Sequence, residues 1–194
     1  MIDVLITTYN RKELLKKTVE SFLSKNKKLP YRLFIVDDFS TDGTVEYLLD
    51  LRSRQKVNLL FPASREGITH GFNALWSWIN HLDIWYEENP YLCYLQDDVL
   101  SVEEEWLLKI LSAYEELKDK YNIGFFSGHH AIEHPVEKTI KWNGSSFYLK
   151  KSNSGQNMIA EKSFWRSIGS PPRLNPDGSM RGFPNHGKGS CLDI

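Results

Sequence analysis

The chain has 194 residues, with 24 lysines and arginines against 25 aspartates and glutamates, and 41 % of it is hydrophobic. Such a composition is typical of one soluble globular domain, and the near-neutral charge argues against nucleic-acid and membrane-surface binding, which favour a basic excess. No apolar run reaches the ~18 residues of a membrane span. Two cysteines, Cys93 and Cys191, are too few for a disulfide framework and favour a reducing, cytoplasmic location.

The first hundred residues alternate strand and helix patterns. Short runs of β-branched and apolar residues predict strands, and apolar residues three or four apart predict helices. The expected strands are Val4–Thr8, Tyr31–Val36, Val57–Phe61 and Tyr91–Leu95. The expected helices are 12–24, 44–54 and 66–88. Strands separated by helices predict a parallel sheet with right-handed crossovers.

The second half has a less regular pattern. We expect a helix over 103–120, a strand over 123–127 and a hairpin over 138–150 that turns at Asn143-Gly144. A short strand over 158–160, a helix over 161–168 and a loop rich in proline, glycine and asparagine up to His186 follow. Since no linker interrupts the chain, we expect a single domain over 1–194.

Polar clusters follow three of the predicted strands, at Thr7–Arg11, Asp37–Asp42 and Gln96–Asp98. Ligands of parallel sheets bind at the carboxyl ends of the strands. Adjacent carboxylates there require a cation or hydrogen-bond donors, and a hard divalent cation takes oxygen ligands while it bridges phosphates. The four carboxylates together predict a metal-nucleotide site, although each pair alone also fits a solvated turn or a helix cap.

Four segments, in this order and spacing, resemble the family 2 glycosyltransferases: VLITTYNRKELLKKTVESFL, FIVDDFSTDGTVEYL, REGITHGFN and YLQDDV. The most specific piece is V-D-D-x-S-x-D-G-T at 36–44. The resemblance implies the GT-A fold, an α/β domain whose central, mainly parallel sheet is flanked by helices. Residues 1–100 would bind the nucleotide sugar and 101–194 the acceptor.

The resemblance also implies an activity, which is inverting transfer of a sugar from a nucleoside diphosphate to an acceptor hydroxyl with Mn²⁺ or Mg²⁺, as in polysaccharide biosynthesis. UDP is the favoured nucleotide, and the acceptor stays open among a glycan, a lipid carrier, a protein and a small molecule. The positions that match nucleotide-binding residues are Thr7, Tyr9, Arg11, Asp37, Asp38, Gly67, His70, Asn73 and Asp97. Of these, Asp38 matches the acid that contacts the base, and Asp37 and Asp97 match residues near the ribose or the sugar.

The metal position of the family is a D-x-D motif. Gln96 replaces its first aspartate, so the resemblance assigns the metal mainly to Asp98. Phe72 stands where many members carry arginine, and Arg65 or His70 would have to supply that charge.

Inverting transfer requires a base that takes the acceptor proton while the diphosphate leaves from the other face. In the family this acid comes late, after a glycine-rich loop. Asp193 is the best match and Asp177 the second choice, although Leu192 replaces the glutamate that usually precedes the base. Since family members continue with another helix, the chain is either a truncated catalytic domain or a minimal version of one, and we favour truncation.

Other motifs give competing interpretations. Residues 130–134 spell H-x-x-E-H, a metalloprotease motif that needs a helix, but Pro135 follows directly and favours a loop. Gly189 takes the hydroxyl position of a near P-loop at 182–189, and no G-x-G-x-x-G follows the first strand, which excludes a dinucleotide oxidoreductase. A nucleotidyltransferase is disfavoured because the first strand lacks a glycine-rich basic loop. An inactive nucleotide-sugar-binding or carbohydrate-binding module remains an alternative.

Overall fold

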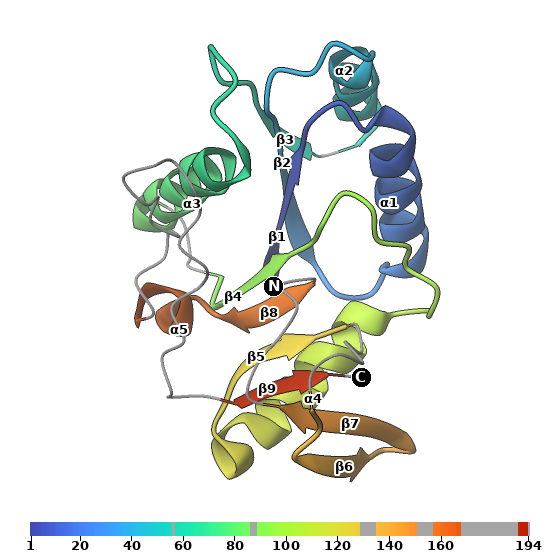
Figure 1. Cartoon of the computed structure of the whole chain (residues 1–194), viewed down its shortest axis with the longest axis vertical. Helices are drawn as coiled ribbons and strands as arrows, with labels where there is room; N and C mark the ends of the chain where they lie inside the picture. Colours follow the sequence, from blue (N-terminus) through green and yellow to red (C-terminus); the bar gives the residue numbers. More distant parts are fainter. Residues whose placement is uncertain (56, 86–88, 129–134, 151–156, 168–189, 194) are drawn as a thin grey trace.

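The computed structural model describes residues 1–55, 57–85, 89–128, 135–150, 157–167 and 190–193, with only the backbone described at 84–85 and 190–193. Five helices and nine strands lie within these ranges (Figure 1). The helices are α1 (Lys12–Lys25), α2 (Thr44–Arg54), α3 (Ile68–Trp85), α4 (Trp106–Tyr121) and α5 (Lys162–Ser167). The strands are β1 (Ile2–Thr8), β2 (Tyr31–Asp37), β3 (Val57–Leu60), β4 (Tyr91–Tyr94), β5 (Ile123–Ser127), β6 (Lys138–Trp142), β7 (Ser145–Lys150), β8 (Met158–Glu161) and β9 (Ser190–Asp193).

All nine described strands belong to one mixed sheet, in the order β3-β2-β1-β4-β8-β5-β9-β7-β6. The strands β3, β2, β1 and β4 are parallel to one another, which confirms the parallel sheet predicted for the first half. Antiparallel β8 joins β4 to β5, so β4 and β5 point the same way. The β6–β7 hairpin extends the sheet beyond β9. The carboxyl ends of β1, β2 and β4 therefore lie at one edge.

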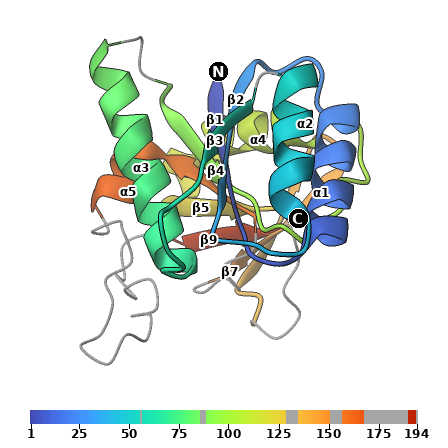
Figure 2. The same cartoon turned by 90° about the horizontal axis from the view of Figure 1, so that it is seen from above.

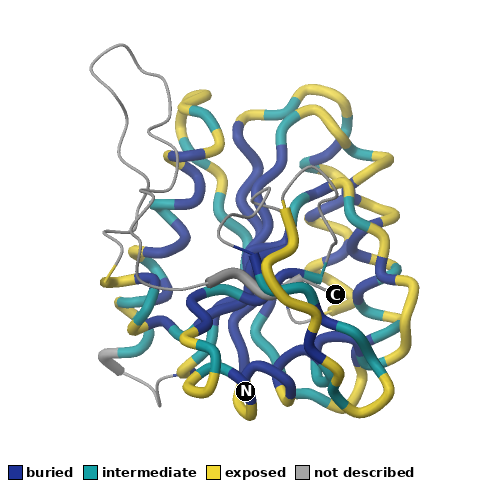
Figure 3. The backbone as a smooth tube through the Cα atoms, turned by 60° about the horizontal axis from the view of Figure 1, so that its bottom comes forward, coloured by how far each residue is buried: buried dark blue, intermediate teal, exposed yellow. Residues whose placement is uncertain are grey.

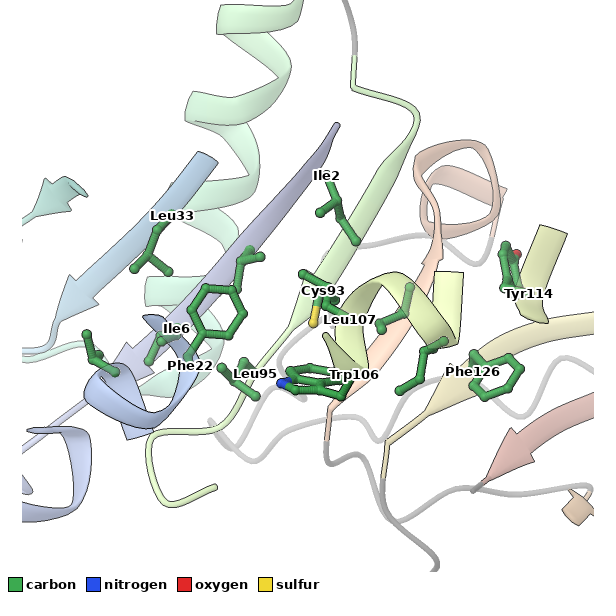
Figure 4. Close-up of a cluster of buried hydrophobic side chains, with 14 of the residues drawn as sticks. Ile2, Ile6, Phe22, Leu33, Cys93, Leu95, Trp106, Leu107, Tyr114 and Phe126 are labelled. Atoms are coloured by element: carbon green, nitrogen blue, oxygen red, sulfur yellow. The ribbon is translucent and has the colours of Figure 1, made fainter. Parts of the chain in front are cut away.

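Helices cover both faces of this sheet, with α1 and α2 on one side and α3 and α5 on the other (Figure 2). Alternate residues of β1 are buried on each side: Ile6 packs in the larger core cluster with Phe22 and Trp106, and Leu5 packs in the second with Phe72. Figure 4 shows part of the larger cluster. Since β1 is buried on both faces, its apolar run is continuous. Figure 3 shows that the buried residues lie in the interior and that the exposed residues lie on the outer helices and loops around them.

Most predicted elements are confirmed, and the helix over 44–54 and the strand over 123–127 have the expected bounds. At the predicted hairpin turn, Asn143 has φ 42° and Gly144 has φ 80°. Two successive left-handed residues are the geometry that a two-residue hairpin with the right twist requires, and asparagine and glycine tolerate it. None of the helices in the described ranges is long and apolar enough to cross a membrane.

Two expectations about the second half are corrected. The helix expected from residue 103 begins at Trp106, because Glu105 has φ 54° and bonds to the end of α1. Its backbone N–H donates to the Lys25 carbonyl at 2.6 Å, and its carboxylate accepts the N–H groups of Lys27 and Lys28. The strand β9, between β5 and β7, has no counterpart among the predicted strands. Contacts distant in sequence decide both features.

Candidate functional site

The loops after β1, β2 and β4 meet at one edge of the sheet, as the sequence predicts. Thr8 and Asp37 are Cα partners at the ends of β1 and β2. The Asp38 N–H donates to the Thr8 carbonyl at 2.9 Å, and the Leu95 N–H donates to the Leu5 carbonyl at 2.9 Å, so the ladder continues into both acidic loops. The predicted site residues on these three loops are therefore brought close to one another.

Asp97 and Asp98, the acid pair, follow β4. They are held by the end of β1 and by residues 9–11, the first loop, which connects β1 to α1. The Thr8 hydroxyl donates to Asp97 Oδ2 at 2.8 Å. Arg11 Nη1 donates both to Asp97 Oδ1 at 3.1 Å and to Asp98 Oδ2 at 3.0 Å. Burial raises the pKa of Asp97, against the opposing effect of the Thr8 and Arg11 hydrogen bonds, and the hydrogen bond to Asp97 raises the pKa of Arg11. Asp98 is more open, with 38 % of its side chain exposed against 9 % for Asp97.

Asp38 is buried and holds the segment that leads into α3. Its Oδ1 accepts the N–H of Glu66 and its Oδ2 accepts the N–H of Gly67, both at 2.9 Å. Gly67 has φ 88°, a left-handed conformation that glycine adopts without strain. These bonds place α3 from Ile68 onward, two residues later than expected. Asp38, which the resemblance expects to contact the base, therefore also holds the segment 66–67 in place.

Asp37 has one oxygen that is satisfied and one that is not. The Ser40 N–H donates to Asp37 Oδ2 at 3.0 Å, whereas Asp37 Oδ1 is buried and has no hydrogen-bond partner within the described part of the chain. Asn73 Oδ1, on α3, is also buried and unpartnered there. An unpaired buried acceptor costs about 1–3 kcal/mol. Both oxygens are therefore positions where a ligand hydroxyl, an amide or a water would be stabilising.

The start of α3 lies close against the ends of β1 and β2. A Cβ on Gly71 would be 2.9 Å from Cγ1 of Val36, so glycine permits this approach. Next to it, His70 Nε2 lies 2.6 Å from Glu66 Oε2, and both side chains are at least one-third exposed. On β1 itself, the Thr7 hydroxyl and the Tyr94 hydroxyl are 3.0 Å apart. The predicted residue His70, which precedes Gly71, thus lies near the end of β1 that carries Thr7.

The loops after β1 and β2 also carry aromatic side chains. The Arg65 guanidinium carbon lies 4.0 Å from the centre of the Tyr9 ring, a cation–π contact. Phe39, directly after Asp38, is 54 % exposed and has φ 70°, an unusual conformation for a bulky residue. A flat ligand such as a nucleobase can stack on rings presented in this way.

Two residues that hold the loops together were not predicted individually. Asn10, with φ 49°, accepts the N–H of Thr41 through Oδ1 at 2.7 Å, and its own N–H donates to the Ser40 hydroxyl. Asp42 accepts the N–H groups of Lys12 and Thr44. Asparagine and aspartate in a turn are the signal for such bonds, although the sequence does not give the distant partner.

Asp193 lies in β9, where its Cα partners are Ser127 of β5 and Tyr148 of β7. Through Met158 of β8 the same row of partners reaches Tyr94 of β4. Asp177, the H-x-x-E-H segment and the near P-loop at 182–189 lie outside the described residues. Within the described ranges, no group of three or more histidine, cysteine or acidic side chains is arranged to hold a metal without other ligands.

Comparison with known proteins finds a family that matches most of the sequence. The family described as "Glycosyl transferase family 2" matches residues 3–166. A relative, Protein CgeD of Bacillus subtilis strain 168, is 27 % identical over 103 residues, which are 51 % of this chain and 23 % of CgeD. The chain thus spans about a quarter of this curated relative.

Solved structures share the fold at low sequence identity. GalNAc-T7, crystallised with UDP, GalNAc and Mn²⁺, has a TM-score of 0.67 at 14 % identity, over all of this chain and 42 % of its own. S. aureus TarS 1-349 with UDP-GlcNAc gives 0.63 at 14 % identity, over all of this chain and 55 % of its own. The mannosyltransferase PcManGT of Pyrobaculum calidifontis, with GDP-Man and Mn²⁺, gives 0.59 at 15 % identity, over 91 % of this chain and 49 % of its own. These likenesses show the GT-A fold predicted from the sequence.

Proposed function

Because the chain belongs to glycosyl transferase family 2, we propose that it transfers a sugar from a nucleoside diphosphate sugar to an acceptor hydroxyl, with inversion and with a divalent metal. The observation that carries the proposal is the acid pair at the end of β4, held against the first loop by Thr8 and Arg11. UDP is the nucleotide we favour, since TarS and GalNAc-T7 are solved with UDP or a UDP sugar. The acceptor stays open, and cytoplasmic location stays a prediction from the cysteine content.

The residues present fit a metal that takes most of its ligands from the nucleotide. Asp98 offers a partly exposed carboxylate, and Asp97 beside it is oriented by Thr8. Mg²⁺ and Mn²⁺ use oxygen ligands and need only one or two protein carboxylates when a diphosphate and water complete the shell. When bound, the metal would neutralise charge that develops on the leaving diphosphate. We assign Asp98 as its protein ligand.

The remaining roles follow from where each residue lies. Tyr9 supplies a ring for the base, while Asp38 shapes the loop around it through its bonds to Glu66 and Gly67. Asp37 has a buried oxygen that no group in the described part of the chain bonds, and this oxygen suits a ribose hydroxyl. Arg11, which is half exposed, is the cation available to the diphosphate on the first loop.

We assign the general base to Asp193, with Asp177 as the second choice. Support comes from the register of β9. Asp193 belongs to a row of Cα partners across the sheet that begins at Tyr94 of β4, and the Tyr94 hydroxyl lies beside the Thr7 hydroxyl. A carboxylate there would take the proton of the acceptor hydroxyl as its oxygen attacks the anomeric carbon. The diphosphate leaves from the opposite face, so no covalent sugar–protein bond forms.

Two variants test these assignments. Calorimetric titration with UDP, GDP and dTDP, each with Mn²⁺ or EDTA, should show metal-dependent binding that Asp98→Ala abolishes. Asp193→Asn should retain this binding and lose release of UDP from the donor in the presence of acceptor. Asp119→Ala, an exposed acid on α4, is the control and should behave as wild type. Normal nucleotide-metal binding by Asp98→Ala would refute the metal assignment.

One alternative is a protein that binds the nucleotide sugar at this site but does not transfer the sugar. Gln96 replaces an acid of the metal motif and Leu192 replaces the acid before the base, and both changes favour an inactive nucleotide-sugar-binding module. Metal-dependent nucleotide binding without turnover on any acceptor would support this alternative. Turnover that Asp193→Asn leaves unchanged would instead move the base to Asp177.

A further inference from the structure

Arg11 occupies the position between the two carboxylates of the acid pair. It is the residue before α1, and one of its nitrogens, Nη1, donates to both Asp97 Oδ1 and Asp98 Oδ2. Half of its side chain is exposed, so the guanidinium reaches the buried Asp97 and the more open Asp98 from the surface of the site. The guanidinium therefore partly neutralises Asp98, the carboxylate that the proposed function assigns to a metal, together with its neighbour Asp97.

This arrangement has an electrostatic consequence for metal binding. Adjacent carboxylates repel each other unless a cation lies between them, and here the guanidinium is that cation. A divalent ion on Asp98 would lie within a few ångströms of Arg11 Nη1, where two positive charges disfavour each other. Metal binding must therefore displace Arg11 or bear the cost of this repulsion.

We propose that Arg11 competes with the metal for the acid pair and is released to the diphosphate when metal and nucleotide bind together. The inference rests on the proposed function for the identity of the second ligand. Guanidinium forms charge-assisted, often bidentate bonds with carboxylates and with phosphates alike, so both positions of Arg11 are chemically satisfied. The donor-free protein would then bind metal weakly, and nucleotide would raise the metal affinity by two routes: added phosphate ligands and the removal of a competitor.

Electron paramagnetic resonance of free Mn²⁺ measures this competition directly, with wild type, Arg11→Met and Arg11→Lys, each with and without UDP. Arg11→Met should bind Mn²⁺ alone about tenfold more tightly than wild type, which corresponds to about 1.4 kcal/mol. The factor by which UDP raises Mn²⁺ affinity should fall by about tenfold in this variant, since only the phosphate ligands still contribute. Arg11→Lys, which keeps the charge but not the planar fork, should lie between the two.

Arg52→Met is the matched control, because it removes an exposed positive charge from the last turn of α2, outside the candidate site. Its Mn²⁺ affinity without UDP should stay close to that of wild type. The proposal is overturned if folded Arg11→Met, checked by circular dichroism, binds Mn²⁺ alone no more tightly than wild type; if that variant does not fold, Arg11→Lys decides in the same way. A wild type that binds Mn²⁺ but no nucleotide would instead refute the proposed function.

Discussion

A buried ionic network lies at the edge of the sheet opposite the candidate site, and removing one of its charges is expected to destabilise the domain. Lys162 of α5 and Asp3 of β1 have no exposed side-chain area, and their charged atoms are 2.7 Å apart. Lys162 also contacts Asp83 of α3 at 2.5 Å, and Arg32 of β2 contacts both acids. Asn89 donates a further hydrogen bond to Asp3 at 2.7 Å. The network therefore connects two helices to two strands.

The two ends of the Lys162–Asp3 contact should respond differently to substitution. Asp3→Asn removes the carboxylate that Lys162 and Arg32 share, and leaves the buried ammonium with Asp83 alone. Breaking a buried pair in this way costs about 3–5 kcal/mol of unfolding free energy. Lys162→Met leaves Asp3 with Arg32 and Asn89, and Asp83 with Arg32. Its cost should be smaller, about 1–3 kcal/mol, because each acid keeps a donor.

Urea unfolding of the whole chain measures both losses, provided that the transition is two-state. In the double variant Asp3→Asn/Lys162→Met both partners of the contact are gone, so the loss should fall short of the sum of the single losses by about 0.5–3 kcal/mol. A loss under about 1 kcal/mol for Asp3→Asn, the range of exposed pairs, would refute the argument. Under the proposed function, folded variants should bind UDP and Mn²⁺ with the affinity of wild type, since Asp3 and Thr8 lie at opposite ends of β1.

Asp42→Ala should lower the unfolding free energy by about 1 kcal/mol at pH 7, the usual net contribution of a hydrogen bond, because the Lys12 and Thr44 N–H groups lose their acceptor. Burial raises the pKa of Asp42, but those hydrogen bonds outweigh it and the net pKa is lowered, so this stabilisation exists above the normal pKa of about 4 and disappears as pH falls through the folded value. Thermal midpoints of wild type and variant should therefore converge at acidic pH, and a constant difference would contradict this origin. Gly71→Ala should destabilise by about 1–3 kcal/mol through contact with Val36, although alanine favours helices. Ser77→Ala, at an exposed position of α3, is its control in the same melts.

The sequence predicts the first half well because the deciding information is local there. Apolar runs mark strands that are buried on both faces, and the parallel topology brings Asp38 and Asp97 to one edge whatever the details of packing. The partners of buried charged side chains are harder to predict from the sequence. Lysine is almost never fully buried, so Lys162 gives no sign in the sequence of its contact with Asp3, and only the isolated acid within an apolar strand hints at one.

The second half depends on contacts between distant segments. Glu105 lies in a good helical pattern, but its bonds to the end of α1 hold it in a left-handed conformation and delay the helix. The four residues of β9 have no alternation that favours a strand, and they pair only because β5 and β7 leave a place between them. Neither local propensity nor periodicity contains this information.

The charged groups of the candidate site differ in what donor binding would change. Asp38 is buried and bonds to two backbone N–H groups, so releasing it would leave them unpaired, and it should keep these contacts when a donor is bound. Arg11 is half exposed and bonds to the open Asp98 as well as to the buried Asp97, and Arg65 lies on the Tyr9 ring. Water and ions can reach these two guanidinium groups, so they can exchange partners when a cation or a phosphate replaces the present contact. Asp38 therefore fixes the shape of the loop before α3, whereas the guanidinium groups of Arg11 and Arg65 are the parts of the site whose contacts would change on donor binding.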